Sequence, residues 1–530
     1  MPQPWWRSAV FYQVYVRSFA DSDGDGIGDL AGITARLEHI RDLGVDAIWL
    51  TPFYPSPQKD HGYDVSDYFD VEPQYGTLDD FDRLIARAHD LRLKVLVDIV
   101  PNHTSDRHPW FQAATSAPDN PLRSRYHFAD PKPDGSPPNN WTSSFSGPAW
   151  SPEPSGKQWY LHLFAPEQPD LNWHDPAVPA EFERILKFWL DRGADGFRID
   201  VAAALFKRPD LADRPYVIDR VTGEMRFDSS FSIIEQPQLH DVYRRWRQIA
   251  NGYEPPRVLV GEIFEPRRHS KYIVPDQLHM AFALIHQRWD AALWRRSIDN
   301  SRRALHGPGV EPTWTLGNHD VIRPVTRLGG GTTGRARARA ALLLLLGLPG
   351  QVFVYQGEEL GLEEADVPPA SRQDPIFIRS QGALIGRDGC RVPLPWRRGE
   401  PNAGFSQKAP WLPMPEGWDR FAVDAQAADG GSTLSHFRRS IAARKSLAGR
   451  LPDHFEWLPS PPGVLAYRRG SLAVACNFSH RVARLEGGGV VEVASDPLVE
   501  LRHGVLTLPA NSAAWLSKVA WRRSVKASGA

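Results

Sequence analysis

"GFRIDV", residues 196–201, places two charged side chains inside an otherwise apolar stretch. Side chains alternate along a β-strand, so Arg198 and Asp200 would share one face while the apolar residues take the other. Charged groups are costly inside a core unless they are paired, so this face is expected to meet a polar site. The stretch therefore predicts a strand that carries functional side chains.

Seven other runs have the same strand-like character, and segments with helical spacing of apolar residues separate them. Two such helical segments are 78–91 and 180–192. Alternation of strands and helices over eight repeats predicts an α/β fold, the (β/α)8 or TIM barrel, in which parallel strands close into a ring. The other strand-like runs are "FYQVYV" from 11, "AIWL" from 47, "VLVDIV" from 95, "VLVGEI" from 258, "HMAFALI" from 279, "TWTLGN" from 313 and "QVFVYQG" from 351.

Two parts of the chain depart from this alternation. The segment after the third strand is rich in Pro, Asn, Ser and Trp and lacks helical periodicity, which predicts an inserted lid subdomain. After Pro459, short alternating runs separated by turn residues predict a C-terminal antiparallel β domain. We expect the barrel in 1–101 and 173–448, the inserted subdomain in 102–172, the C-terminal β domain in 449–520 and a polar, disordered tail in 521–530.

Composition narrows the possible partners and the compartment. A formal net charge of -1 gives no electrostatic reason to expect nucleic acid or an anionic membrane. Two cysteines exclude a disulfide framework, and the N-terminus lacks the pattern of a secretory signal. The apolar run from Ala340 is broken by Gly and Pro and is shorter than the ~18 residues of a membrane span. We expect a cytoplasmic protein, and the sequence leaves monomer and homodimer open.

Polar side chains gather at the ends of the predicted strands. The active site of a (β/α)8 barrel lies at the C-terminal ends of its strands. A single carboxylate there can simply cap a helix, but several charges in one cavity repel one another, which is tolerated where chemistry uses them. Paired carboxylates without zinc ligands or a phosphate loop predict acid and nucleophile roles on a glycosidic bond. These strand-end residues are Asp98, Asn102, His103, Arg198, Asp200, Glu262, Asn318, His319 and Asp320.

Six motifs in order along the chain resemble those of the α-amylase family of glycoside hydrolases (family 13), and within it the α-glucosidase and oligo-1,6-glucosidase group. The resemblance implies that Asp200 is the nucleophile, Glu262 the general acid and then base, and Asp320 the transition-state stabiliser. The motifs are "DIVPNH" (98–103), "QPDLNW" (168–173), "GFRIDV" (196–201), "GEIF" (261–264), "GNHD" (317–320) and "QGEELG" (356–361).

These roles carry electrostatic expectations. Arg198, two residues from Asp200 on the same strand face, is expected to keep the nucleophile ionised. Glu262 must begin protonated, so its surroundings are expected to raise its pKa. The two carboxyl groups are expected about 5 to 5.5 Å apart, as in glycosidases that retain the anomeric configuration through a covalent intermediate. We therefore predict retention of the α configuration.

The resemblance also assigns sugar-binding residues. His103 and His319 resemble the pair that hydrogen-bonds the hydroxyls of the non-reducing glucose, and Tyr63 resembles its stacking platform. A lone buried histidine is more often a satisfied polar group, and only the motifs favour the functional interpretation. Phe145 and Phe164 either line the same pocket or pack the lid.

Asp60 and Arg391 resemble a pair that closes the pocket by binding the 4-hydroxyl of the terminal glucose. A closed end rejects longer chains at that point, which implies exo-action on small α-glucosides. The alternative is a surface ion pair between two long loops.

"DSDGDGIGDL", from Asp21, is a candidate calcium loop. Asp21, Asp23, Asp25 and Asp29, with the backbone carbonyl of Ile27, would supply hard oxygen ligands suited to Ca²⁺. The loop is not an EF-hand, because its twelfth position is glycine, but relatives in the family bind calcium at the matching loop. A solvated acidic turn is the alternative.

The sequence thus predicts an exo-acting, retaining α-glucosidase for short α-glucosides, with maltose-type α-1,4 substrates first. The run "VAAAL" after Asp200 departs from the oligo-1,6-glucosidase pattern, which places α-1,6 substrates second. A transglucosidase or sucrose isomerase would use the same intermediate and is the nearest alternative. Non-catalytic transporter partners share the ancestry but lack intact acids, so that class is disfavoured.

Overall fold

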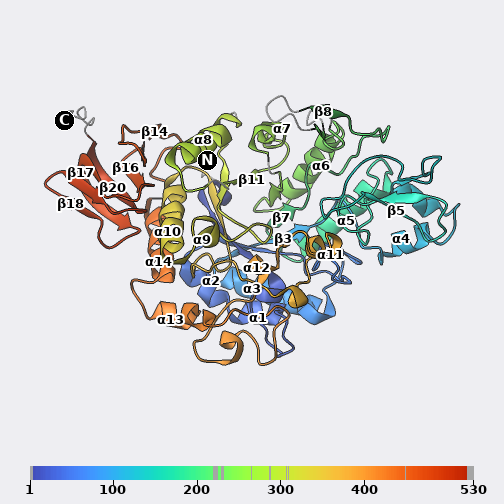
Figure 1. Cartoon of the computed structure of the whole chain (residues 1–530), viewed down its shortest axis with the longest axis horizontal. Helices are drawn as coiled ribbons and strands as arrows, with labels where there is room; N and C mark the ends of the chain where they lie inside the picture. The colour runs from blue at the N-terminus through green and yellow to red at the C-terminus, as the bar shows by residue number, and fades with distance from the viewer. Residues whose placement is uncertain are drawn as a thin grey trace.

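Eight parallel strands close into a barrel at the centre of the molecule (Figure 1). In this computed structural model, residues 4–521 are described except 219–224, 228–231, 264, 286–287, 306, 308–309 and 448. All eight strands coincide with the predicted runs, so the predicted barrel is confirmed. In ring order the strands are β1 (Val10–Val14), β13 (Gln351–Tyr355), β12 (Thr313–Thr315), β11 (Met280–Leu284), β10 (Val258–Gly261), β7 (Gly196–Ile199), β3 (Lys94–Ile99) and β2 (Ala47–Leu50).

Amphipathic helices cover the outside of the barrel. Helix α3 (Leu78–Asp90) begins with a capping box, in which Thr77 and Asp80 satisfy each other's backbone amides. Its apolar side chains face inward because they recur at helical spacing. The other main helices are α1 (Leu30–Ala35), α2 (Leu37–Leu43), α5 (Ala177–Asp191), α6 (Leu239–Asn251), α8 (Ala291–Arg303), α10 (Gly331–Gly347) and α14 (Thr433–Leu447).

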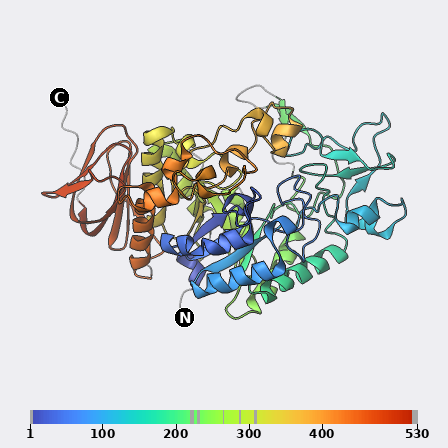
Figure 2. The ribbon, with the colours of Figure 1, turned by 90° about the horizontal axis from the view of Figure 1, so that it is seen from below.

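The inserted subdomain and the C-terminal domain lie at opposite ends of the molecule, with the barrel between them (Figures 1 and 2). The insert carries α4 (Pro109–Ala114) and a small antiparallel sheet of β4 (Phe128–Ala129), β6 (Trp159–Leu161) and β5 (Trp150–Pro152). Trp141, Trp150 and Leu161 are buried in its own small core. A two-stranded hairpin that the sequence patterns did not predict follows β7, formed by β8 (Tyr216–Ile218) and β9 (Met225–Phe227).

The C-terminal domain is a seven-stranded antiparallel sheet, as predicted. Helix α10 joins it to the barrel, because Tyr467 Oη and Trp515 Nε1 donate hydrogen bonds to the carbonyls of Leu344 and Leu343. The predicted tail lies outside the described residues from 522 onward. The strands in sheet order are β14 (Glu456–Trp457), β15 (Val464–Arg469), β16 (Leu472–Asn477), β20 (Ala513–Trp521), β17 (Ala483–Ala494), β19 (Val505–Leu508) and β18 (Glu500–Arg502).

The apolar run from Ala340 forms the second half of α10. It is buried on all sides because it lies between the barrel and the C-terminal sheet. Within the described part of the chain, no helix combines the length and the apolar character needed to cross a membrane.

Candidate active site

Strand register brings the charged residues of β3, β7 and β10 together. Asp98 and Arg198 are direct partners on neighbouring strands. Beyond the strand ends the ladder continues for one residue, since the amide of Asp200 donates to Ile99 O and that of Glu262 to Ile199 O. The three carboxylates and the guanidinium therefore meet at the C-terminal mouth of the barrel, as the fold requires.

Arg198 is the centre of this cluster. Its Nη1 donates to Asp200 Oδ1 at 2.7 Å and to both carboxylate oxygens of Asp98 at 3.0 and 3.1 Å. Its Nη2 lies 2.7 Å from Glu262 Oε1. The guanidinium is almost fully buried and stacks over the ring of Trp49 at 4.9 Å. The two candidate catalytic carboxyl groups are thus held on the two terminal nitrogens of one side chain.

Arg198 is shared among three buried carboxyl groups, and burial acts against the ionisation of two of them. Burial raises the pKa of Asp98 to about 7, against the opposing charge of Arg198. Burial also raises the pKa of Asp200 well above its ordinary value; Arg198 opposes this and Glu262 adds to it. The expected pairing of Arg198 with Asp200 is present. That Arg198 keeps Asp200 ionised for attack stays a prediction, because burial and the neighbouring Glu262 raise the pKa of Asp200 while Arg198 lowers it.

Glu262 also contacts the backbone beside the nucleophile. Its Oε2 accepts a hydrogen bond of 2.8 Å from the amide of Val201. Val201 has a positive φ of 45°, which is rare for a β-branched residue and aims this amide at the carboxyl group. The predicted proton on Glu262 stays a prediction, since both groups that contact its carboxyl are donors.

At the other end of the site, Asp60 pairs with Arg387 rather than with Arg391. Arg387 Nη2 donates to Asp60 Oδ1 at 2.9 Å, and its Nη1 donates to Asp320 Oδ1 at the same distance. Its Nε donates a third hydrogen bond, to Asp374 Oδ2 at 2.7 Å. The prediction that Arg391 is the partner of Asp60 is therefore wrong.

Arg391 lies one layer behind this pair. Fully buried, it donates to Asp320 Oδ1 at 2.9 Å and to the carbonyl of His319 at 2.8 Å. Burial raises the pKa of Asp320, but the neighbouring His319, Arg387 and Arg391 outweigh it and hold that pKa below its ordinary value. Arg391 therefore orients Asp320 instead of closing the pocket.

The two predicted sugar-binding histidines are buried and neutral. Burial lowers the pKa of His103 to about 3 and that of His319 well below its ordinary value. His319 Nδ1 lies 2.7 Å from the side-chain Nε2 of Gln13, so Nδ1 accepts and Nε2 of the histidine carries the proton. Its ring stacks on Tyr63, with centroids 5.4 Å apart and planes 4° from parallel. This geometry leaves a neutral N–H donor beside Asp320.

These residues line one pocket of about 470 Å³. Of the residues to which the resemblance assigns catalytic or sugar-binding roles, Arg198 and Arg391 lie behind its wall and the others line it. Phe145 and Phe164 meet edge to face with centroids 5.3 Å apart, so both line the pocket as well as pack the lid. The predicted residues that line it are Asp60, Tyr63, His103, Phe145, Phe164, Asp200, Glu262, His319 and Asp320.

The sequence pattern of the family described as "Alpha amylase, catalytic domain" matches residues 13–449. The chain belongs to the α-amylase family. The barrel carries acidic residues at the C-terminal ends of its strands, and the resemblance to this family predicted the catalytic groups at those ends.

Similar proteins span nearly the whole of this α-amylase family chain. A probable α-glucosidase of Rhizobium meliloti is 40% identical over 94% of this chain and 95% of its own length. An oligo-1,6-glucosidase of Heyndrickxia coagulans is 35% identical over 91% of this chain and 93% of its own length. Among solved structures, the α-glucosyl transfer enzyme XgtA has a TM-score of 0.90 at 39% identity, covering 97% of this chain and 99% of that one. The trehalulose synthase MutB of Pseudomonas mesoacidophila has a TM-score of 0.87 at 31% identity, covering 98% and 100%.

Sequence reasoning missed three residues that hold the family's site together. Arg387 stands four positions before Arg391 in the motif "GRDGCRVPLPW" (386–396), so the motif was a signal but could not choose between the two arginines. Gln168 opens "QPDLNW" and bridges the site, with Nε2 at 3.1 Å from both Asp60 Oδ2 and His103 Nε2. Lys207, seven residues after Asp200, is fully buried, and no pattern in the sequence marked it.

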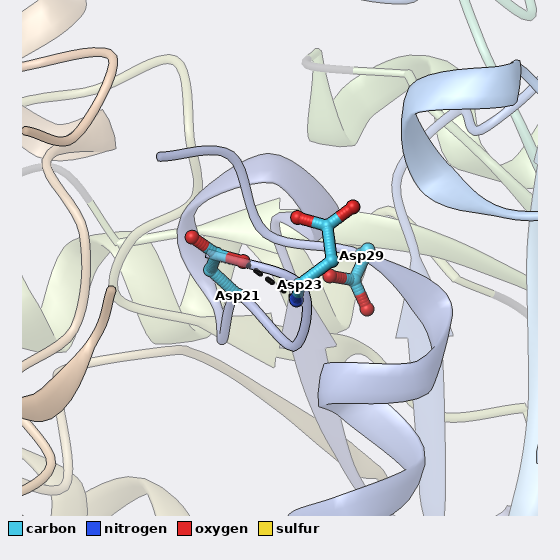
Figure 3. Close-up of side chains that lie close together, drawn as sticks. All are labelled: Asp21, Asp23 and Asp29. Carbon is cyan, nitrogen blue, oxygen red and sulfur yellow. Dashed lines mark hydrogen bonds between the residues drawn. The ribbon is translucent and has the colours of Figure 1, made fainter. Parts of the chain in front are cut away.

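The predicted calcium loop brings together three of its four aspartates (Figure 3). One carboxylate oxygen each from Asp21, Asp23 and Asp29 lies within 4.8 Å of the others. Asp25 is outside this group and accepts a hydrogen bond from the amide of Ile27 at 2.7 Å. Asp29 also caps α1 through the amide of Gly32. Clustered carboxylate oxygens fit the ligands that Ca²⁺ prefers.

Proposed function

We propose that this chain is an exo-acting, retaining α-glucosidase that releases glucose from the non-reducing ends of short α-glucosides. One observation carries the proposal: Asp200 and Glu262 lie on the two terminal nitrogens of Arg198 at the base of a pocket that Asp60 and Arg387 close. Retaining glycosidases need two carboxyl groups close enough to share one sugar, at about 5 to 5.5 Å.

The reaction then runs in two displacements. Asp200 attacks the anomeric carbon and forms a glucosyl ester, while Glu262 gives its proton to the departing glycosidic oxygen. Glu262, now a carboxylate, takes a proton from water as the water oxygen bonds to the same carbon and the ester bond breaks. Asp320, kept ionised by its arginines, faces the positive charge that develops on the sugar ring.

Exo-action follows from the closed end. Arg387 is held by three carboxylates, those of Asp60, Asp320 and Asp374, so it cannot swing aside for a longer chain. The terminal glucose would present its 4-hydroxyl to Asp60 and Arg387, and the two neutral histidines would bind neighbouring hydroxyls.

Maltose-type α-1,4 substrates remain the first choice and α-1,6 substrates the second. The relatives carry both names, α-glucosidase and oligo-1,6-glucosidase. Transfer of glucose to a second sugar, or isomerisation of sucrose, is the alternative, and two similar structures are an α-glucosyl transfer enzyme and a trehalulose synthase. All use the same covalent intermediate.

The catalytic proposal predicts that Asp200→Asn lowers the initial rate of glucose release from maltose by about 10³-fold or more, because the amide cannot form the ester. Proton NMR of the first product should show α-glucose before mutarotation. The matched control, Asp210→Asn at an exposed position, should keep the wild-type rate. An Asp200→Asn enzyme with unchanged activity, or β-glucose as first product, contradicts the proposal.

We also propose that the 21–29 loop binds one structural Ca²⁺ through Asp21, Asp23 and Asp29. Bound metal would neutralise carboxylates that otherwise repel one another, and it stabilises the folded state by mass action. The Tm after chelation should rise when Ca²⁺ is added back, and Asp21→Asn should abolish this response while Asp119→Asn, at an exposed position, keeps it. If neither the chelator nor added Ca²⁺ changes the Tm, the proposed calcium site is wrong.

A cytoplasmic location is part of the proposal. Both cysteines, Cys390 and Cys476, are buried and unpaired, as is common where thiols are kept reduced. Cell fractionation with an activity assay tests it, and sedimentation would decide between monomer and homodimer.

A further inference from the structure

Helix α11 (Pro375–Arg379), in the segment after β13, lies next to the inserted subdomain at the closed end of the pocket (Figure 1). Its first turn and Arg387 share one carboxylate. Asp374 Oδ1 accepts a hydrogen bond of 2.7 Å from the amide of Ile376, which lines the pocket. Asp374 Oδ2 accepts bonds of 2.7 Å from both the amide and Nε of Arg387. Asp374 therefore fixes the helix and the arginine of the closed end as one unit.

The last residue of α11 reaches the inserted subdomain. Arg379 Nη2 donates a hydrogen bond of 2.8 Å to the carbonyl of Ser146, which lies in a turn of that subdomain. Ser146 has a positive φ of 79°, which is uncommon for a residue with a side chain and persists only where the surroundings hold it. A Cβ atom at the next residue, Gly147, would lie 3.4 Å from Arg379 Nη2. The backbone of this turn is therefore packed directly against the guanidinium.

The same turn carries Phe145, a buried ring that lines the pocket. The Arg387 guanidinium lies over this ring at 4.8 Å, which is the geometry of a cation–π contact. Ser143 anchors the start of the turn, because its Oγ donates a hydrogen bond of 2.7 Å to Phe164 O. Arg379 anchors the other side of the turn. The position of the Phe145 ring against Arg387 therefore depends on both anchors.

We propose that Arg379 is a positioning residue for the terminal glucose, because it fixes the Phe145 turn against Arg387 and so sets the affinity of the closed end. The contacts form a closed ring: Asp374 holds both α11 and Arg387, and the turn joins the other end of α11 to Arg387 through Phe145. Binding groups that are held in place beforehand lose less freedom when the ligand binds. Arg379 does not line the pocket, so it acts through the turn and does not touch the sugar. The inference rests on the proposed function, because it needs the terminal glucose at the closed end.

The test compares Arg379→Met with the wild type on maltose, with glucose as a competitive inhibitor. Methionine keeps an apolar stem but has no donor, so the turn loses its bond to α11. We expect KM for maltose and Ki for glucose to rise together by about five-fold, with less than about two-fold change in kcat, because ground-state and transition-state binding weaken equally. Glucose fills one sugar position only, so its Ki reports on the closed end.

Two further variants separate the hydrogen bond from the loss of an arginine in general. Arg379→Lys should give a KM between those of the wild type and Arg379→Met, because an ammonium group can still donate to Ser146 O. Arg184→Met is the matched control, since Arg184 is exposed on α5 and pairs with Glu181 on the same helix. This control should keep KM, Ki and kcat.

Wild-type KM and Ki in Arg379→Met overturn the inference and leave the glucosidase proposal intact. A lower kcat or Tm with unchanged KM also overturns it, because that result gives Arg379 a purely structural role. If Arg379→Met does not fold, Arg379→Lys decides, and a wild-type KM in that variant is evidence against the inference. If the wild type releases glucose from neither maltose nor isomaltose, the proposed function is wrong and this inference falls with it.

Discussion

At the scale of single residues, two arginines organise the site in different ways. Arg198 is shared by three carboxyl groups and holds them together at the base of the pocket. Arg387 is held by three others and forms a fixed wall at the closed end. A guanidinium suits both places because it is planar, permanently charged and offers several donors in fixed directions. Charge alone would not reproduce either arrangement.

Arg387→Lys tests this difference between charge and geometry. An ammonium group can satisfy one or two of the three carboxylates, so the closed end loosens and the terminal glucose is held less firmly. We expect KM for maltose to rise about ten-fold with a smaller change in kcat, measured by initial rates.

The exposed substitution Arg397→Lys, in a surface pair with Glu400, is the control and should keep both constants. An Arg387→Lys enzyme with wild-type KM would show that the wall does not hold the sugar.

At the scale of elements, the segment that opens with Gln168 leads from the inserted subdomain back to the barrel, and it contacts the pocket. His103 forms a β-bridge with Asp170, and the amide of Leu171 donates to Asn102 O. Lys207, from the loop after β7, joins both segments: its Nζ lies 2.8 Å from Asp170 Oδ2 and donates to Asn102 Oδ1 at 2.7 Å. One buried ammonium thus connects three segments of the chain behind His103.

Lys207→Met should destabilise the protein because it leaves Asp170 buried without its cation. Loss of one partner of a buried pair costs about 3 to 5 kcal/mol, whereas replacing both can be nearly neutral. We therefore expect a clear loss of stability in urea unfolding for Lys207→Met and partial recovery in the double variant Lys207→Met with Asp170→Asn. Equal loss in the single and double variants would mean that packing, not charge, sets the role of Lys207.

Sequence patterns predict elements well where each one buries its own apolar run, and this explains why all eight barrel strands were found. The hairpin of β8 and β9 was missed because its strands are three residues each and carry no such run. The acids at the strand ends could be predicted as one site because the C-terminal ends of all barrel strands lie at the same end of the barrel. The partner of Asp60 was predicted wrongly, because Arg387 and Arg391 belong to one motif. Only the backbone path between them decides which of the two side chains reaches the pocket.

At the scale of the whole molecule, the C-terminal sheet and the barrel share helix α10 as a common core. A helix buried on all sides must be apolar all round, which is why its leucine run resembles a membrane segment in sequence without being one. The sheet approaches so closely at Gly347 that a Cβ atom there would lie 2.4 Å from Tyr467 Oη and 2.7 Å from Val474 Cγ2. This contact gives the relation between the two domains a direct test.

Gly347→Ala should lower the Tm, because the added methyl group forces the sheet away from α10 and overpacking typically costs about 1 to 3 kcal/mol. Gly430→Ala is the matched control, since nothing lies within 4 Å of a Cβ atom at that position. Combining Gly347→Ala with Tyr467→Phe removes the nearest atom of the clash but also the hydrogen bond to Leu344 O, so recovery should be partial. If calorimetry gives Gly347→Ala the same Tm as the wild type, the C-terminal sheet does not pack closely against α10 at Gly347, and other contacts join the two domains.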